Sequence, residues 1–111
     1  MTAIPTPLIK HPPIVLLVAL RDDLARSCAT AIAPFPTMRA ASATTAVERL
    51  PIVRPLVVVV ADDLPPDDLR LVSERAADVT AVVVHVSHDD DVQKLESSLK
   101  QAASEAEARR G

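Results

Sequence analysis

The stretch LVVVVA at residues 56–61 decides the fold class, because it holds four consecutive valines and no polar residue. β-branched side chains lose rotamer freedom in a helix and pack well on a pleated sheet. A run that is apolar at every position, rather than at alternate positions, is typical of a parallel strand covered on both faces. Residues 56–61 therefore predict a fully buried strand of a parallel sheet.

Similar runs lie on both sides of this stretch, and helical patterns separate them. Residues 14–20 and 81–86 are almost wholly apolar, and residues 37–41 predict a shorter, more polar strand. The apolar residues at helical spacing are, in chain order, Leu24, Cys28, Ala31 and Ile32; Ala46, Val47 and Leu50; Leu69, Val72 and Ala76; and Val92, Leu95, Leu99, Ala102 and Ala106. Strict alternation of strands and helices predicts a parallel sheet with right-handed crossovers and helices on both faces.

Polar residues and prolines set the expected helix ends. Small polar side chains accept hydrogen bonds from the free N–H groups of a helix start, and proline removes a donor from a helix interior. Pro34 and Pro51 are expected to end the first two helices. The expected caps are Asp22 or Asp23, Ser42, and Asp67 or Asp68.

The chain divides into three segments. Residues 1–13 contain four prolines and predict an extended arm, because proline biases the residue before it toward extended backbone. Residues 14–100 hold all the predicted strands and form one α/β domain. Residues 101–111 extend the last helix.

Composition excludes several classes of function. The one glycine is the last of 111 residues, which rules out a glycine-rich phosphate loop. One phenylalanine, no other aromatic residue and a net charge of -3 argue against a nucleic-acid partner. No apolar run approaches the length of roughly 20 residues that spans a bilayer, so we expect no membrane segment and a cytoplasmic location.

Residues of the types that bind metals or act as nucleophiles have structural explanations. His85, His88 and the aspartates at 89–91 form a cluster, but their spacing dictates no third convergent ligand, and the aspartates suit a helix start. Cys28 lies on an apolar helix stripe and predicts core packing. We expect no metal site, no cofactor and no catalytic residue.

Residues 14–18 (IVLLV) and 54–65 (RPLVVVVADDLP) resemble the first strand, the third strand and the following loop of the response-regulator receiver domain. The resemblance implies a flavodoxin-like, three-layer αβα fold. The parallel sheet then has the order 2-1-3-4, and the last βα unit of the family is missing.

The resemblance also implies where the chemistry of the family would lie. The acidic pair that holds Mg²⁺ corresponds to Ala19 and Leu20, and the phosphoacceptor, six residues after Pro55, corresponds to Ala61. Neither side-chain type offers an oxygen to a metal or a phosphoryl group. The hydroxyl residue that closes strand four is kept as Ser87. The chain therefore resembles a pseudo-receiver that has lost metal binding and phosphoryl transfer.

Shifting the alignment with the receiver family by one residue leaves an alternative open. It makes Asp62 the phosphoacceptor, and Asp22 or Asp23 could then supply an acidic neighbour. The third candidate function is an assembly or scaffold subunit. The preferred hypothesis is a phosphorylation-independent protein-binding module of bacterial signalling. The bacterial origin is inferred from the excess of Arg, Ala and Val, which suggests a GC-rich genome.

A missing fifth strand leaves strand four at the edge of the sheet. Apolar edges with unpaired backbone groups recruit another strand. Residues 6–10, the last helix or a second chain could cover this edge, and we predict a homodimer through strand four and the last helix. Its expected contact residues are Val82, Val84, Val86, Val92, Leu95 and Leu99.

Overall fold

Four strands alternate with four helices in the computed structural model, which describes residues 13–110. The predicted arm lies outside the described residues apart from Pro13. The elements are β1 (Val15–Val18), α1 (Asp22–Ile32), β2 (Thr37–Ala40), α2 (Ala43–Val53), β3 (Val57–Ala61), α3 (Pro66–Asp78), β4 (Val82–Val86) and α4 (Val92–Arg110).

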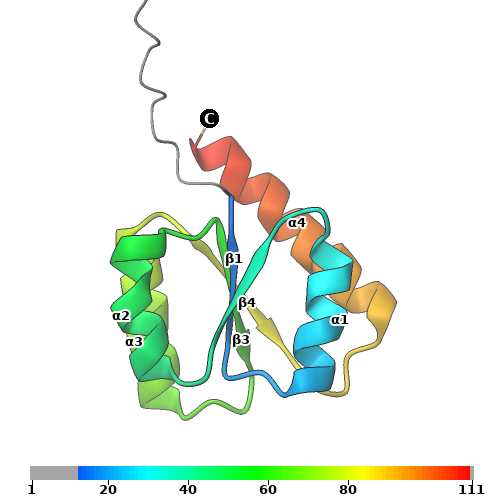
Figure 1. Ribbon diagram of the computed structural model, residues 1–111, viewed down its shortest axis with the longest axis horizontal. Helices are drawn as coiled ribbons and strands as arrows, with labels where there is room; N and C mark the ends of the chain where they lie inside the picture. Colours follow the sequence, from blue (N-terminus) through cyan, green and yellow to red (C-terminus); the bar gives the residue numbers. More distant parts are fainter. Residues whose placement is uncertain (1–12, 111) are drawn as a thin grey trace, which may run out of the picture.

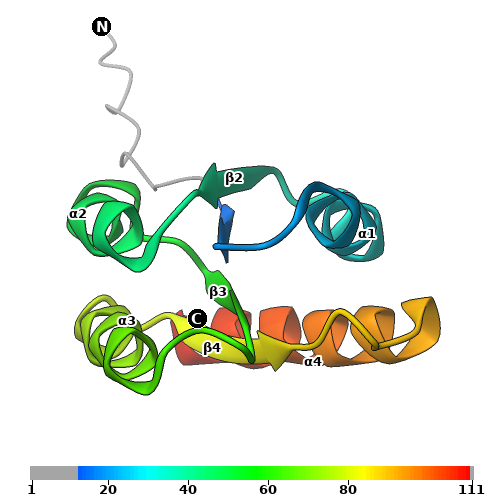
Figure 2. The same ribbon diagram turned by 90° about the horizontal axis from the view of Figure 1, so that it is seen from below.

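The strands form one parallel sheet in the order β2-β1-β3-β4, as predicted. Helices α1 and α4 cover one face, and α2 and α3 cover the other (Figures 1 and 2). The three-layer αβα architecture is therefore confirmed. Every residue of β3 is buried, as the valine run predicts for a strand covered on both faces.

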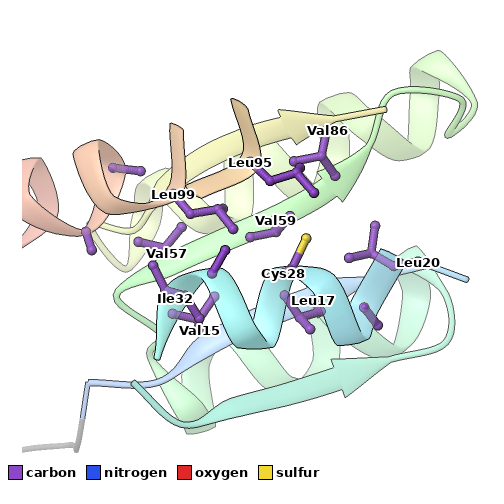
Figure 3. Packing of buried hydrophobic residues seen from close by; sticks show 14 of the residues in the cluster. Val15, Leu17, Leu20, Cys28, Ile32, Val57, Val59, Val86, Leu95 and Leu99 are labelled. Carbon is purple, nitrogen blue, oxygen red and sulfur yellow. The ribbon is translucent and has the colours of Figure 1, made fainter. Parts of the chain in front are cut away.

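The position of α4 follows from the handedness of the crossovers. The step from β1 to β2 crosses the sheet in one direction, and the steps to β3 and β4 cross it in the other. Right-handed connections then place α1 alone on one face and α2 with α3 on the other. Helix α4 fills the vacant half of the α1 face, where Leu95 and Leu99 pack with Cys28, Ile32 and Val59 (Figure 3).

The strands and helices begin and end differently from the predictions at several positions. The predicted first strand, residues 14–20, ends at Val18, because Ala19 has a left-handed backbone with φ 56°. Ser42 caps α2 as predicted, accepting a hydrogen bond from the Thr45 N–H at 3.2 Å. Helix α2 continues through Pro51 and ends where Arg54 becomes left-handed, so the predicted stop is wrong. Pro51 lacks the N–H of a normal helix position, but it lies in the last turn of α2, where the Arg54 N–H still donates to the Leu50 carbonyl at 2.9 Å.

The predicted aspartate caps of α1 and α3 are also wrong. Arg21 precedes α1 and Pro65 precedes α3, and neither supplies a side-chain cap. The four aspartates lie in the first turns instead, where a carboxylate interacts favourably with the positive end of the helix dipole. They are Asp22 and Asp23 in α1 and Asp67 and Asp68 in α3.

Candidate functional site

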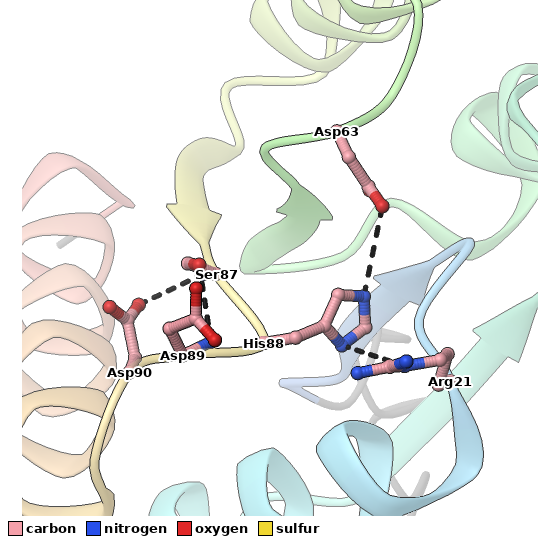
Figure 4. A network of polar contacts seen from close by, with 6 residues as sticks. All are labelled: Arg21, Asp63, Ser87, His88, Asp89 and Asp90. Atoms are coloured by element: carbon pink, nitrogen blue, oxygen red, sulfur yellow. Dashed lines mark hydrogen bonds and ion pairs between the residues drawn. The ribbon is translucent and has the colours of Figure 1, made fainter.

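The loops after β1, β3 and β4 meet at the carboxyl edge of the sheet, where open α/β sheets place their ligand sites. Arg21 Nε donates a hydrogen bond to Nδ1 of His88 at 3.2 Å. The other ring nitrogen of His88, Nε2, lies 4.0 Å from Oδ2 of Asp63. The imidazole therefore links all three loops (Figure 4), and only 18% of its side chain is exposed.

A second set of contacts closes the loop between β4 and α4. The Ser87 N–H donates to Oδ2 of Asp90 at 2.9 Å, and the Asp89 N–H donates to Oγ of Ser87 at 3.2 Å. The Ser87 N–H lowers the pKa of Asp90 below its usual value, and Lys94, at 3.1 Å, adds to the effect. These bonds give Ser87 and Asp90 a structural role at the start of α4.

The positions that the resemblance assigns to metal and phosphate chemistry carry no polar side chain. Leu20 is 6% exposed and Ala61 is fully buried, while Ala19 forms the left-handed turn after β1. Asp62 is exposed, and its backbone N–H donates to the Val86 carbonyl at 2.8 Å. Within residues 13–110, no three His, Cys, Asp or Glu side chains are grouped to hold a metal ion.

Cys28 is buried between α1 and α4. Burial raises its pKa to about 11, and the negative charge of Asp90 acts in the same direction. Since the thiolate is the nucleophilic form, this thiol is poorly suited to covalent chemistry. Its place in the core agrees with the sequence prediction.

The predicted contact residues divide into buried and accessible groups. Leu95 and Leu99 are 2% and 0% exposed, and Val86 is 1% exposed, so the chain's own core contains all three. The helical seam of α4 therefore packs on its own sheet, and that part of the predicted interface needs correction. Val82 and Val84 are half-buried on the same face, and Val92 is 60% exposed.

β4 keeps one side of its backbone open among the described residues. The Val82 N–H donates to the Leu56 carbonyl at 3.2 Å, and the Val86 carbonyl accepts from the Asp62 N–H at 2.8 Å. Alternate residues of a parallel strand bond to opposite sides. The backbone groups of Val83 and His85 therefore point away from β3, toward the edge of the sheet.

The opposite edge, at β2, carries a charged side chain. Arg39 donates to Oδ1 of Asp22 at 2.8 Å and to the Leu20 carbonyl at 2.9 Å. A hollow of about 370 Å³ lies between β2 and α1 beside this ion pair. Proline and charged residues discourage strand addition; Pro36 directly precedes β2, and Arg39 lies within it. β4 has neither.

Local sequence spacing does not predict the contacts of His88 with Arg21 and Asp63, and it groups His88 with His85 instead. The structure separates the two histidines, with His85 exposed on β4 and His88 beside Arg21. Their positions in the sequence could have indicated the contact. Arg21, Asp63 and His88 each follow a predicted strand closely, and the carboxyl ends of parallel strands meet at one edge of the sheet. No helix among the described residues combines the length and apolar character that a bilayer crossing requires.

Neither protein-family models nor curated proteins match the sequence. Solved structures do match the fold. The signal receiver domain of a Luxo repressor protein from Vibrio parahaemolyticus superposes with a TM-score of 0.70 at 15% identity, over 88% of this chain and 95% of that one. The signal receiver domain of an HD domain-containing protein from Pseudomonas fluorescens gives 0.58 at 20% identity, over 86% and 98%. The chain has the fold of receiver domains.

The receiver fold alone does not determine an activity. A de novo designed Rossmann 2x3 protein also matches, with a TM-score of 0.63 at 10% identity over 85% of this chain and 90% of that one. One fold hosts many functions, so a function must be argued from the site.

Proposed function

We propose that this chain is a non-catalytic pseudo-receiver that binds a protein partner without phosphorylation, in bacterial signalling or regulation in the cytoplasm. We assign the module to residues 14–100, preceded by an arm at 1–13 and followed by a helix extension at 101–111. The receiver fold supports a role in signal transduction.

The side chains at the carboxyl edge carry this proposal. Ala19, Leu20 and Ala61 stand where the receiver resemblance expects the metal-binding pair and the phosphoacceptor. Mg²⁺ binds through hard oxygen ligands, which alanine and leucine lack. The guanidinium of Arg21 is held at this edge by His88 and would repel a divalent cation placed beside it.

Asp62 supports a second candidate, a working phosphoacceptor, because its carboxylate is exposed directly after β3. Intact-mass measurement after incubation with acetyl phosphate and Mg²⁺ separates the two functions. The proposal expects no phosphoryl adduct on the full chain. An adduct that disappears in Asp62→Asn would establish the second candidate instead.

The partner-binding surface that we propose is the edge of β4 with the exposed start of α4 at Val92, and the proposed partner is a second copy. Val82 and Val84 are half-buried there, and the outward backbone groups of Val83 and His85 lack a neighbouring strand among residues 13–110. Light scattering at micromolar concentration is expected to give a dimer. A stable monomer would contradict the homodimer, and larger assemblies would favour the scaffold alternative.

A further inference from the structure

We infer that two copies of the chain pair their β4 strands antiparallel, with the two-fold axis at Val84. This inference rests on the homodimer of the proposed function and specifies its geometry. The two sheets then form one continuous sheet across both copies. The register is determined by which outward N–H groups of β4 are not already used by hydrogen bonds inside each chain.

Two N–H groups are available on the outer side of β4. The ladder to β3 directs the N–H groups of Ala81, Val83, His85 and Ser87 outward. The Ala81 N–H is already used by the Ala76 carbonyl at 2.9 Å, and the Ser87 N–H by Asp90 Oδ2 at 2.9 Å. The donors left for a neighbouring strand are those of Val83 and His85.

These two residues complement each other on an identical antiparallel strand. An axis at Val84 places Val83 opposite His85 of the second copy. Residues in such a hydrogen-bonded pair exchange both of their bonds. Every outward N–H and C=O of Val83 and His85 then has a partner in the other copy.

Neighbouring registers make the same number of bonds, but in them one residue of β4 pairs with a residue outside the strand and forms one bond in place of two. An axis at Val83 places His85 opposite Ala81, whose N–H is occupied, so the His85 carbonyl has no donor. An axis at His85 places Val83 opposite Ser87, whose N–H is also occupied, so the Val83 carbonyl has no donor. Only the axis at Val84 forms both exchanging pairs between residues of β4 itself, without using Ala81 or Ser87, so we prefer this register.

The side chains agree with this register. Val84 faces Val84 of the second copy in a non-hydrogen-bonded pair, where side chains lie closest. The half-buried Val84 gains cover from Val84 of the second copy, and the half-buried Val82 lies opposite Val86 of that copy. His85 faces a valine, so the two copies bring no histidine directly opposite another.

Symmetry favours a closed dimer over an open assembly that keeps adding copies. An antiparallel pair of identical strands is two-fold symmetric and closes on itself. A parallel pair of the same strand would use opposite sides of it, and β3 already occupies the inner side of β4. Continued growth would require the outer edge of β4 to pair with β2 of another copy. The other edge of the sheet, at β2, carries the exposed Arg39 beside Pro36, so it is a poor site for strand addition.

Single cysteines test the register in the full chain. Directly opposite residues of a non-hydrogen-bonded pair have Cα atoms about 4.5 Å apart, within the range that a disulfide spans. Val84→Cys is expected to form an intermolecular disulfide under mild oxidation. Val83→Cys and His85→Cys alone are expected to form none, whereas a mixture of the two forms the heterodimeric disulfide. Cys28 is buried and serves as an internal thiol that stays reduced.

Two measurements make the result decisive. Far-UV circular dichroism verifies that each variant folds, and hydrogen exchange of the unmodified chain is expected to show Val83 and His85 amides gaining protection as concentration rises. A dimer that cross-links through Val83→Cys or His85→Cys alone, or fails to do so through Val84→Cys, overturns the register but leaves the homodimer standing. A monomer overturns both, and concentration-independent protection in that monomer assigns the edge to another segment of the chain.

Discussion

Arg21 Nε donates a hydrogen bond to Nδ1 of His88 over 3.2 Å, although the two residues are 67 positions apart in the chain. The bond joins the end of β1 to the end of β4 across the intervening β3 (Figure 4). Asp63 approaches the other side of the same imidazole at 4.0 Å. A cation therefore occupies the edge of the sheet where metal chemistry would require acidic oxygens, which supports the pseudo-receiver proposal.

This bond predicts energetic coupling between the two residues. In a double-mutant cycle, Arg21→Ala and His88→Ala are expected to show a coupling energy of about 0.5 to 1 kcal/mol, the net value of one hydrogen bond in a partly exposed site. Urea denaturation of the four proteins measures it. Arg26→Ala is the control, because Arg26 is an exposed arginine of α1, the helix that Arg21 precedes; it is expected to change stability by less than about 0.5 kcal/mol. Additive single effects would refute the coupling.

Proline is expected to affect the dimer differently at the two edge strands of the sheet, β4 and β2. His85→Pro removes an outward N–H of β4 while the bonds to β3 remain, so the dimer should dissociate without loss of the fold. Thr37→Pro removes an outward N–H of β2 and should leave the dimer intact. Light scattering reports the oligomeric state, and circular dichroism reports the fold. If both variants remain dimeric, β4 is not the interface.

Asp90 predicts a pH-dependent stability difference. Its pKa is lowered chiefly by the Ser87 N–H and further by Lys94, so the stabilisation is present above the ordinary aspartate pKa of about 3.9 and is lost as pH falls through the folded value. Asp90→Asn should therefore cost about 1 kcal/mol at neutral pH, with the difference from the unmodified chain shrinking on acidification.

Urea denaturation at several pH values measures this difference. Asp89→Asn is the matched control, because the Asp89 side chain is exposed and only its backbone N–H bonds to Ser87. It is expected to change stability at neutral pH by less than about 0.5 kcal/mol. A cost for Asp90→Asn that persists unchanged into acid would contradict the carboxylate's role.

Hydrophobic pattern, the receiver resemblance and connection rules together predict most of the fold. The valines of β3 specify a strand buried on both faces, and the resemblance implies the strand order. Right-handed crossovers then specify the faces of α1, α2 and α3. The spacing of Leu95 and Leu99 is the same for a helix that packs on its own sheet and for one that packs on a partner. The spacing therefore also predicts an interface for residues that the chain's own core buries.

The site is less accessible to sequence reasoning. Ala19 and Leu20 continue an apolar run, so no residue type marks the left-handed turn that ends β1. Arg21 and His88 are joined only because the sheet brings the ends of β1 and β4 together. Their contact depends on topology and side-chain reach, neither of which appears in local spacing.

Cys28 predicts a thiol that is unreactive until the protein unfolds. Burial raises its pKa to about 11, with Asp90 adding to the effect, so almost all of it is protonated near neutral pH. A colorimetric disulfide reagent should react slowly with the folded chain and rapidly after denaturation in urea. Ile52→Cys, at a position on α2 that is 72% exposed and lies outside the proposed dimer surface, should add one thiol that reacts at once. Immediate reaction of the unmodified chain would contradict the buried environment.

The backbone conformation of Thr80 predicts that glycine at this position stabilises the turn between α3 and β4. Its φ of 62° lies in the left-handed region, which a β-branched residue occupies at a cost of about 1 to 2 kcal/mol. The side chain is exposed, and the backbone N–H bond to the Ala77 carbonyl at 3.0 Å does not depend on it. Thr80→Gly should raise the free energy of unfolding by about 0.5 to 1 kcal/mol, because relief of strain outweighs the greater entropy of glycine in the unfolded chain.

Chemical denaturation of two companion variants separates strain from side-chain loss. Thr80→Ala keeps a Cβ atom in the left-handed turn and should gain less than Thr80→Gly. Thr30→Gly places glycine within α1 and should lose about 0.3 kcal/mol, the difference between the helix propensities of threonine and glycine. If Thr80→Gly is no more stable than Thr80→Ala, the turn stores no backbone strain, and the gain must come from removing the threonine side chain.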